Sequence, residues 1–333
     1  MSQDPSLQDT ITDARATSAP DVSQDGRLGR FLVIRKLGEG AMGTVFTAYD
    51  EELDRRVAIK VLNRDSRDED TRARLLREAQ ALAKLSHPNV VQVYEVGQSA
   101  GAVFIAMEFV AGQTLRTWMD AGPRPWAQTL AKFAEAGRGL AAAHDAGLIH
   151  RDFKPDNAIV GEDDRVRVLD FGLARADGSG TPVLDELDNP LRLDDTGPET
   201  ALRSGSEQSA RLSSTLTRTG ARMGTPAYMA PEQYQAGTSD ARTDQFSFCV
   251  ALWEAVYGER PFRGGSLAAL GYAVLNGNIE PPPRGTAVPG WLHAVLLRGL
   301  STRPEDRHPD MQSLLRELSR DRARRWRVAG LGL

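Results

Sequence analysis

The octapeptide His-Arg-Asp-Phe-Lys-Pro-Asp-Asn, at residues 150–157, is the most specific part of the sequence. It places the carboxylate of Asp152, the cation of Lys154 and the amide of Asn157 close together in one stretch of chain. The tripeptide Asp-Phe-Gly follows at residues 170–172, across a predicted hairpin. Oxygen ligands from two neighbouring loops, Asn157 and Asp170, suit Mg²⁺, which takes few protein ligands and adds phosphate oxygens. The two motifs therefore predict a magnesium and phosphate site.

A glycine-rich element lies upstream, where residues 38–45 follow the pattern G-x-G-x-x-G-x-V. Taken alone this pattern is weak, because dinucleotide-binding folds have similar spacing and an ordinary hairpin also satisfies it. A dinucleotide-binding loop runs from a strand into a helix, whereas residues 44–49 have the pattern of a strand. We therefore favour a glycine-rich turn between two strands, which offers backbone N–H groups to phosphates.

Lys60 lies in the apolar segment Val-Ala-Ile-Lys-Val at residues 57–61. A buried lysine is costly without an anionic partner, so phosphate oxygens and one carboxylate are expected near it. Glu78 is the best candidate carboxylate, because it shares a helical face with the apolar residues Ala79 and Leu82. For an isolated lysine, a solvated position on an edge strand remains the alternative.

Hydrophobic patterning predicts an α+β protein with a small strand-rich part followed by a larger helical part. The expected strands are residues 31–34, 44–49, 57–61, 90–96 and 103–107, with one helix at residues 71–85. The expected helices of the second part are residues 129–146, 243–257, 267–275, 291–299 and 309–320. Residues 1–28 and an insertion at residues 176–222 are polar and without periodicity, and we expect both to be disordered.

In this order, the motifs resemble those of eukaryotic-type protein kinases, and the resemblance covers residues 29–319. Gly-Thr-Pro-Ala-Tyr-Met-Ala-Pro-Glu at residues 224–232 and Asp-Gln-Phe-Ser-Phe at residues 244–248 resemble the bacterial serine/threonine kinases most closely. The resemblance implies a bilobal kinase fold, with an N-lobe at residues 29–108, a hinge at 108–113 and a C-lobe at 114–319.

The family implies a role for each matching residue. Lys60 would hold the α- and β-phosphates of ATP and pair with Glu78, while Asp152 would orient the acceptor hydroxyl and take its proton. Lys154 indicates serine and threonine acceptors, and Asn157 and Asp170 would bind Mg²⁺. Other implied nucleotide contacts are the phosphate-covering Gly38, Gly40 and Gly43, the adenine-enclosing Val45, Ala58 and Ile159, the gatekeeper Met107, and the hinge residues Glu108 and Val110.

The family also implies regulation by phosphorylation of the activation segment. Arg151, beside the catalytic aspartate, would bind the phosphate, and Thr217 and Thr219 are the predicted phosphosites. Thr225 would bond to Asp152 and Lys154. Further implied positions are His150 stacked below Phe171, a buried Glu232–Arg307 pair, and Cys249 where the family often has glycine.

The function expected is therefore phosphate transfer from ATP to serine and threonine hydroxyls of proteins, with a dimer of the chain serving autophosphorylation in trans. One alternative is a pseudokinase scaffold, which would typically lack at least one of the residues Lys60, Asp152, Asn157 and Asp170, all present in this sequence. The other is a small-molecule kinase, which residues 224–232 argue against because they resemble a peptide-binding segment. The net charge of −4 argues against nucleic acid as a partner. A polar N-terminus and the lack of a long apolar stretch predict a cytoplasmic protein. The basic tail, residues 320–333, is interpreted either as a helix end or as a juxtamembrane segment that contacts lipid.

Overall fold

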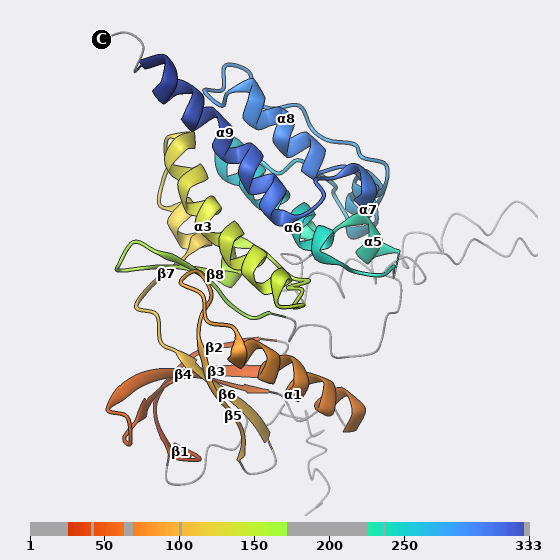
Figure 1. Cartoon of the computed structure of the whole chain (residues 1–333). Coiled ribbons are helices and arrows are strands. Elements are labelled where there is room, and N and C mark those ends of the chain that lie inside the picture. The colour runs from red at the N-terminus through yellow and green to blue at the C-terminus, as the bar shows by residue number, and fades with distance from the viewer. Residues whose placement is uncertain are drawn as a thin grey trace, which may run out of the picture.

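The computed structural model describes residues 26–40, 43–62, 69–99, 102–171, 226–235 and 237–329, with the backbone alone at 69–75 and 321–329. Within these residues the chain forms two lobes, one built on a sheet and one mainly helical (Figure 1). The predicted insertion at residues 176–222, the phosphosites Thr217 and Thr219, and Thr225 lie outside the described residues.

The N-lobe is an antiparallel six-stranded sheet with the strand order β1-β2-β3-β4-β6-β5. Helix α1 packs beside β5 (Figure 1). The elements are β1 (Arg27–Leu28), β2 (Phe31–Gly40), β3 (Gly43–Asp50), β4 (Arg55–Leu62), α1 (Glu69–Lys84), β5 (Val93–Ser99) and β6 (Ala102–Glu108).

The alternation of side chains along β4 gives the sheet two different faces. Val57, Ile59 and Val61 are buried in a core that belongs to the N-lobe alone. Ala58 belongs to the second core, which continues into the C-lobe, and Lys60 lies on the same face because it is two residues further along. Because side chains alternate between the two faces of the sheet, Lys60 lies on the face directed at the C-lobe.

The C-lobe consists of helices with a three-stranded sheet and short 3₁₀ turns beside them (Figure 1). Helix α3 packs against both α6 and α9. The elements are β7 (Gly112–Thr114), α2 (Leu115–Asp120), α3 (Trp126–Asp145), β8 (Ala158–Gly161), β9 (Val166–Val168), α5 (Pro231–Tyr234), α6 (Ala241–Tyr257), α7 (Leu267–Leu275), α8 (Gly290–Gly299) and α9 (Met311–Ala329), and the 3₁₀ turns are Pro155–Asn157, Pro226–Tyr228 and Pro304–Asp306.

Helix α6 runs through the interior of the C-lobe. Every residue from Thr243 to Trp253 is buried, which is the pattern of a helix that is covered on all sides. Its ends are set by local chemistry: the Asp240 side chain accepts the N–H of Arg242 at 2.7 Å, and Gly258 ends the helix with a φ of 75°. Polar side chains on this buried helix therefore need partners inside the lobe, and several of those partners belong to the site described below.

The expected helices of both lobes are confirmed to within about one turn, except that the helix expected at residues 309–320 continues to Ala329. The expected strand at residues 90–96 is only partly right, because β5 begins at Val93. Val90 and Val91 instead bond to β9, where the N–H of Val91 donates to the carbonyl of Val168 at 3.0 Å. Helix α2 was not predicted, since six residues are too few to show helical periodicity.

Both ends of the chain differ from expectation. Strand β1 falls inside the predicted tail of residues 1–28, and it pairs with β2. The basic run at residues 320–327 continues helix α9, whose backbone is helical to Ala329. Within the described part of the chain, no helix is both long and apolar enough to cross a bilayer.

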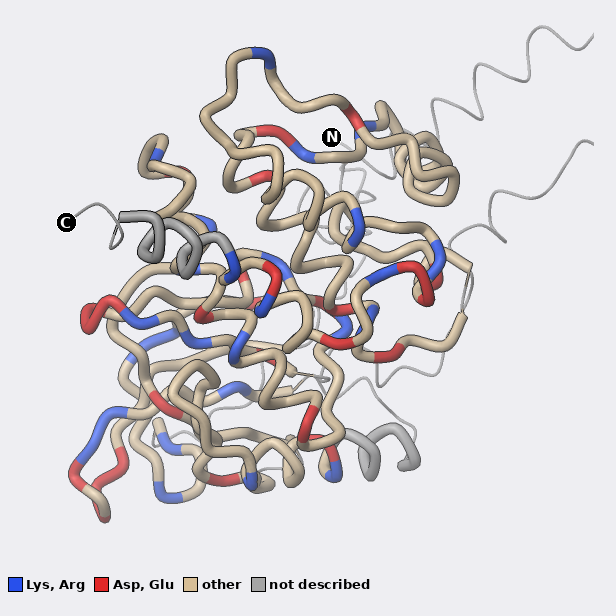
Figure 2. The backbone as a smooth tube through the Cα atoms, turned by 45° about the horizontal axis from the view of Figure 1, so that its top comes forward, with Lys and Arg blue, Asp and Glu red and all other residues tan. Residues whose placement is uncertain are grey.

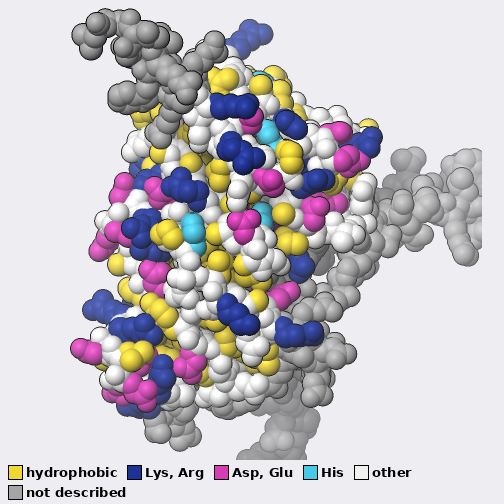
Figure 3. Space-filling view, in the orientation of Figure 1, with side chains coloured by type: hydrophobic (Ala, Val, Ile, Leu, Met, Phe, Trp, Pro, Cys, Tyr) yellow, Lys and Arg dark blue, Asp and Glu magenta, His cyan; other side chains and the backbone are white. Residues whose placement is uncertain are grey.

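Charges of both signs are interspersed over the surface. Figure 2 shows Lys and Arg positions alternating with Asp and Glu positions along both lobes. The face seen in Figure 3 carries the same mixture, with small apolar areas between the charged side chains. Among the described residues seen in these views, charges of the two signs are thus mixed rather than gathered into one field.

Cys249 packs against Gly299, where α6 meets α8. A Cβ atom at Gly299 would lie 2.2 Å from the Cys249 Sγ atom, so the two residues are complementary in size. Burial raises the pKa of the Cys249 thiol to about 12, which keeps the sulfur protonated. Cys249 is therefore a packing residue.

This packing predicts a measurable coupling between the two positions. Gly299→Ala should lower the free energy of unfolding by about 1–3 kcal/mol through overpacking, and Cys249→Gly should also destabilise the protein. The double variant should be less destabilised than the sum of the two by about 1 kcal/mol, because the new methyl group fills the space left by sulfur. Urea unfolding of the four proteins measures this coupling, and strict additivity would contradict the packing described.

Candidate active site

The loop that carries Asp152 is fixed by a carboxylate of the buried helix α6. Asp244 accepts the backbone N–H of His150 at 2.8 Å and that of Arg151 at 2.7 Å. The Nε2 atom of His144 lies 2.7 Å from the same carboxylate. Asp244 is fully buried, so these bonds are formed away from water and are expensive to lose.

The backbone of this loop is held in a conformation that it would not adopt unaided. Arg151 has a φ of 64° and Asp170 a φ of 56°, in the left-handed region that non-glycine residues seldom occupy. The Arg151 carbonyl accepts the Gln233 side-chain amide at 2.8 Å. Bonds on both sides of Arg151 thus compensate for local strain, which is common where a loop must present a side chain.

Asp152, Lys154 and Asn157 form one hydrogen-bonded group. The Lys154 Nζ atom donates to Asp152 Oδ2 at 2.9 Å. The Asn157 Nδ2 atom donates to the Asp152 backbone oxygen at 2.8 Å and to Oδ2 at 3.2 Å. Because the Asn157 amide group turns its nitrogen to Asp152, its oxygen points away from that carboxylate.

Lys60 and Asp170 meet across the cleft between the lobes. The Lys60 Nζ atom lies 2.9 Å from Asp170 Oδ1, and the lysine side chain is 5% exposed. The ring of the next residue, Phe171, packs on His150 with centroids 4.9 Å apart, which confirms the predicted contact, although the rings are tilted by 53° and not stacked. His150 also bonds through Nε2 to the Leu169 carbonyl at 2.7 Å, so it supports the loop and is not a base.

The predicted pairing of Lys60 with Glu78 is wrong for this structure. The described ion pair of Lys60 is with Asp170, whereas Glu78 Oε1 lies 3.6 Å from Arg151 Nη1. Lys60 still has the carboxylate that its burial requires, but from the Asp-Phe-Gly motif instead of α1. The helix therefore contributes its carboxylate to the catalytic loop and not to the strand.

The residues predicted to enclose a nucleotide lie on the sheet of the N-lobe and on β8 of the C-lobe. Gly38 pairs with Val45 in the β2–β3 hairpin, and Gly40 pairs with Gly43. Gly43 must be glycine, since a Cβ atom there would lie 2.0 Å from the Val61 carbonyl oxygen. On the facing strands, Val45 lies opposite Lys60 and Ala58 lies opposite Met107, while Ile159 lies on β8 of the other lobe.

The hinge residue Glu108 is held by one contact with the N-lobe and one with the C-lobe. The Glu108 N–H donates to the Gln92 carbonyl at 2.8 Å, and the Glu108 carboxylate lies 3.0 Å from Arg167 Nε. The N–H of Glu108 is therefore already used within the protein. Glu108 is the last residue of β6, and Val110 lies in the irregular segment that follows.

Glu232 and Arg307 form the buried pair that the sequence predicted. Arg307 donates from Nη1 and Nη2 to the two Glu232 oxygens at 2.9 and 2.8 Å, and Thr243 of α6 donates to Oε1 at 2.8 Å. Burial alone would raise the pKa of Glu232, but the bonds from Arg307 outweigh it and hold the pKa below its usual value. The pair joins α5, α6 and the segment before α9.

Sequence reasoning missed a second polar cluster, centred on Glu254 near the end of α6. Tyr228 and Arg116 donate to Glu254 Oε2 at 2.6 and 2.9 Å, and Arg260 Nε donates to Oε1 at 3.1 Å. Burial alone would raise the pKa of Glu254, but these bonds lower it, so the carboxylate is ionised. Arg116 and Tyr228 come from segments distant in the sequence from Glu254 and Arg260, so no local spacing could have revealed the cluster.

The donors that face the cleft fit a divalent cation shared with phosphates. The Asn157 oxygen and the Asp170 carboxylate are hard ligands of the kind that such ions prefer. Within the described residues there is no cluster of three or more His, Cys, Asp or Glu that could hold a metal alone. A metal bound at this position would therefore complete its shell with oxygens from the substrate.

Comparison with known proteins places the chain in a family. The protein kinase domain matches residues 31–325, so the chain belongs to the protein kinase domain family. It is 35% identical to the serine/threonine-protein kinase PknB of Mycobacterium leprae over 91% of this chain and 44% of that protein. It is 36% identical to the serine/threonine-protein kinase pkn3 of Myxococcus xanthus, over 87% of this chain and 49% of that protein.

These matches support a kinase of the bacterial serine/threonine type with the predicted bilobal α+β fold. The chain spans about half the length of these two curated relatives. Among solved structures, the PknI kinase domain of Mycobacterium tuberculosis matches with a TM-score of 0.61 over 90% of this chain and 98% of that one. At 23% identity this match supports the fold alone.

Proposed function

We propose that the chain is a serine/threonine protein kinase that transfers the γ-phosphate of ATP to hydroxyl groups of proteins. The observation that carries the proposal is the hydrogen-bonded group of Asp152, Lys154 and Asn157, which lies in the same cleft as the Lys60–Asp170 pair. These residues supply a carboxylate, two cations and two hard oxygen ligands. Phosphate transfer from a nucleotide needs groups of these kinds.

Each residue has a role that follows from its contacts. Asp152 orients the acceptor hydroxyl and accepts its proton at Oδ1, because Lys154 and Asn157 already donate hydrogen bonds to Oδ2. Lys154 balances negative charge between the acceptor and the transferring phosphate. Lys60 supplies a buried cation for the phosphates on the donor side, where it faces the glycine-rich hairpin.

The cofactors proposed are ATP and Mg²⁺. When bound, magnesium neutralises the negative charge of the phosphates during transfer. Asn157 and Asp170 would hold it, and Asp170 must then share its carboxylate between the metal and Lys60. Gly38 and Gly40 have open space at their Cα atoms, which allows the hairpin to approach a phosphate closely.

We further propose that phosphorylation of the activation segment switches the ion pairs of the cleft. Arg151 faces Glu78 at 3.6 Å, and a phosphate carries about −1.5 to −2 charges against the single charge of a carboxylate. A phosphate on Thr217 or Thr219 that binds Arg151 would compete with Glu78 for this guanidinium.

The pseudokinase alternative has less support. Lys60, Asp152, Asn157 and Asp170 are all present, and each has contacts that fit its proposed role. A pseudokinase scaffold would need none of them for catalysis. Incubation with labelled ATP, Mg²⁺ and a set of generic acceptor proteins, both basic and acidic, separates the two, because only a kinase transfers label to an added protein.

Two substitutions test the catalytic assignment. Asp152→Asn and Lys60→Met should each lower kcat by several orders of magnitude, because each removes a group that acts in the transition state. Asp152→Asn should still bind ATP, since its side chain does not touch the nucleotide. Near-normal turnover of Asp152→Asn in a steady-state assay would show that another residue orients the acceptor.

The switch is tested at the two predicted phosphosites. The double variant Thr217→Ala and Thr219→Ala should lose about tenfold or more in activity, because a charge-assisted bond to Arg151 contributes about 1.5–3 kcal/mol. Mass spectrometry of the active enzyme should find phosphate on these residues and not on Ser213, Ser214 or Thr215 alone. Full activity of the double variant would rule out this assignment.

A further inference from the structure

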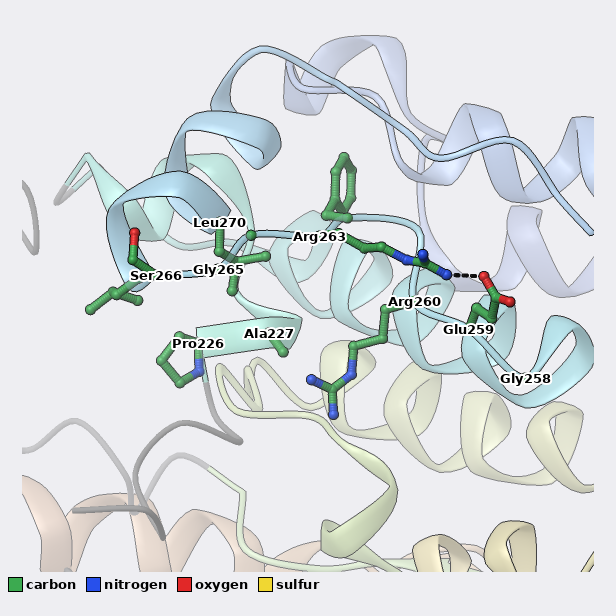
Figure 4. A pocket seen from close by; sticks show the side chains of 12 residues that line it. Pro226, Ala227, Gly258, Glu259, Arg260, Arg263, Gly265, Ser266 and Leu270 are labelled. Carbon is green, nitrogen blue, oxygen red and sulfur yellow. Dashed lines mark hydrogen bonds and ion pairs between the residues drawn. The ribbon is translucent and has the colours of Figure 1, made fainter. Parts of the chain in front are cut away.

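A pocket adjoins the turn at Pro226 and opens between that turn and the start of helix α7. Its volume is about 780 Å³, and Figure 4 shows the side chains that line it. One part of the lining is apolar, formed by Pro226, Phe262, Leu267 and Leu270. Arg260 contributes a cation beside this apolar part.

The pocket is tied directly to the catalytic loop through α5. The Tyr234 hydroxyl donates to the Pro226 carbonyl at 2.6 Å, while the preceding residue, Gln233, donates to the Arg151 carbonyl at 2.8 Å. Consecutive residues of α5 thus join the pocket wall to the residue before Asp152. For a substrate chain whose hydroxyl reaches Asp152, side chains near that hydroxyl are the groups that this pocket could select.

The carboxylate that pairs with Arg260 is already occupied and offers little to a basic side chain. Both oxygens of Glu254 accept hydrogen bonds, Oε1 from Arg260 and Oε2 from Arg116 and Tyr228, within the described residues. The Glu254 side chain is 13% exposed. A lysine or arginine of a substrate would have to displace two arginines from it and would also approach the positive charge of Arg260.

Arg260 itself still has donors to offer. Its side chain is 38% exposed, and among the described residues its hydrogen bond is made by Nε. The two Nη groups therefore remain for an incoming group, and a guanidinium edge of this kind matches a carboxylate. Figure 4 shows Arg260 extending toward the side of Pro226 and Ala227.

Arg263 provides an internal comparison in the same pocket. Its guanidinium pairs with Glu259, and in Figure 4 it extends away from Pro226 and Ala227. Its charge is thus compensated locally and is not directed at the turn. Of the two arginines that line the pocket, Arg260 is the one positioned to bind an anion.

We propose that Arg260 selects protein substrates that carry an aspartate or glutamate side chain near the acceptor serine or threonine. The apolar part of the pocket accommodates the chain beside that carboxylate. This inference deepens the proposed kinase function and rests on it. It assigns a substrate class, acidic sequences, and a specificity residue whose two Nη groups recognise the carboxylate.

The test uses matched acceptor peptides that differ by Glu, Gln or Lys at each position flanking one threonine. The wild-type protein should show a kcat/KM about tenfold higher for Glu than for Gln in at least one position, as expected for a partly exposed charge-assisted contact. In Arg260→Gln this ratio should fall to about one, and in Arg260→Glu the preference should change to Lys. Arg263→Gln is the control and should keep the wild-type ratio.

Binding measured by fluorescence anisotropy with the same peptides provides a readout that does not depend on turnover. The same order of preference is expected, with loss of the Glu preference in Arg260→Gln. A wild-type preference for Lys, or an unchanged Glu preference in Arg260→Gln, would overturn the inference. Transfer to peptides without any acidic preference contradicts this inference alone, whereas no transfer to any protein or peptide contradicts the proposed function.

Discussion

The carboxylate of Asp244 accepts two successive backbone N–H groups, those of His150 and Arg151, in the interior of the C-lobe. This interaction sets the position of Asp152, because the next residue along the chain has no freedom once these two peptide groups are fixed. It also compensates for the left-handed conformation of Arg151. The helix that carries Asp244 is buried along most of its length, so the anchor is as rigid as the core of the lobe.

The same helix organises the other polar groups around the site. Thr243 bonds to Glu232, Ser247 donates to the Tyr228 carbonyl at 2.7 Å, and Glu254 holds Arg116 and Arg260. The loop that carries Asp152 is thus attached near the beginning of this helix, and the arginines beside the pocket are attached near its end. The ion pairs of the cleft are different in kind, because Lys60 and Glu78 belong to the N-lobe while Asp170 and Arg151 belong to the C-lobe. Each of these pairs therefore joins the two lobes, and a relative movement of the lobes would change it.

Most of the fold could be predicted from the sequence, and so could the grouping of the polar residues at 150–157. Hydrophobic periods of two and 3.6 locate the strands and long helices, and the close spacing of Asp152, Lys154 and Asn157 places them together. The partner of Lys60 was predicted wrongly, because the choice between Glu78 and Asp170 depends on how α1 sits against the sheet, which no local pattern encodes. The Glu254 cluster was missed for a similar reason, since Arg116, Tyr228 and Arg260 meet only after the C-lobe has folded. The predicted phosphosites lie outside the described residues.

The central claim is that a buried carboxylate on α6 positions the catalytic loop, and the single-turnover rate of phosphate transfer in Asp244→Asn tests it most directly. Asparagine keeps the shape of the side chain but turns an amide N–H₂ group toward one of the two backbone donors. The loop should then lose its alignment, and a small displacement of a catalytic group is enough to reduce the rate by about 10². The single-turnover rate of Asp244→Asn should therefore fall by about 10², while the affinity for ATP and the far-UV circular dichroism spectrum stay unchanged. A folded variant that transfers phosphate within about threefold of the wild-type rate would contradict it.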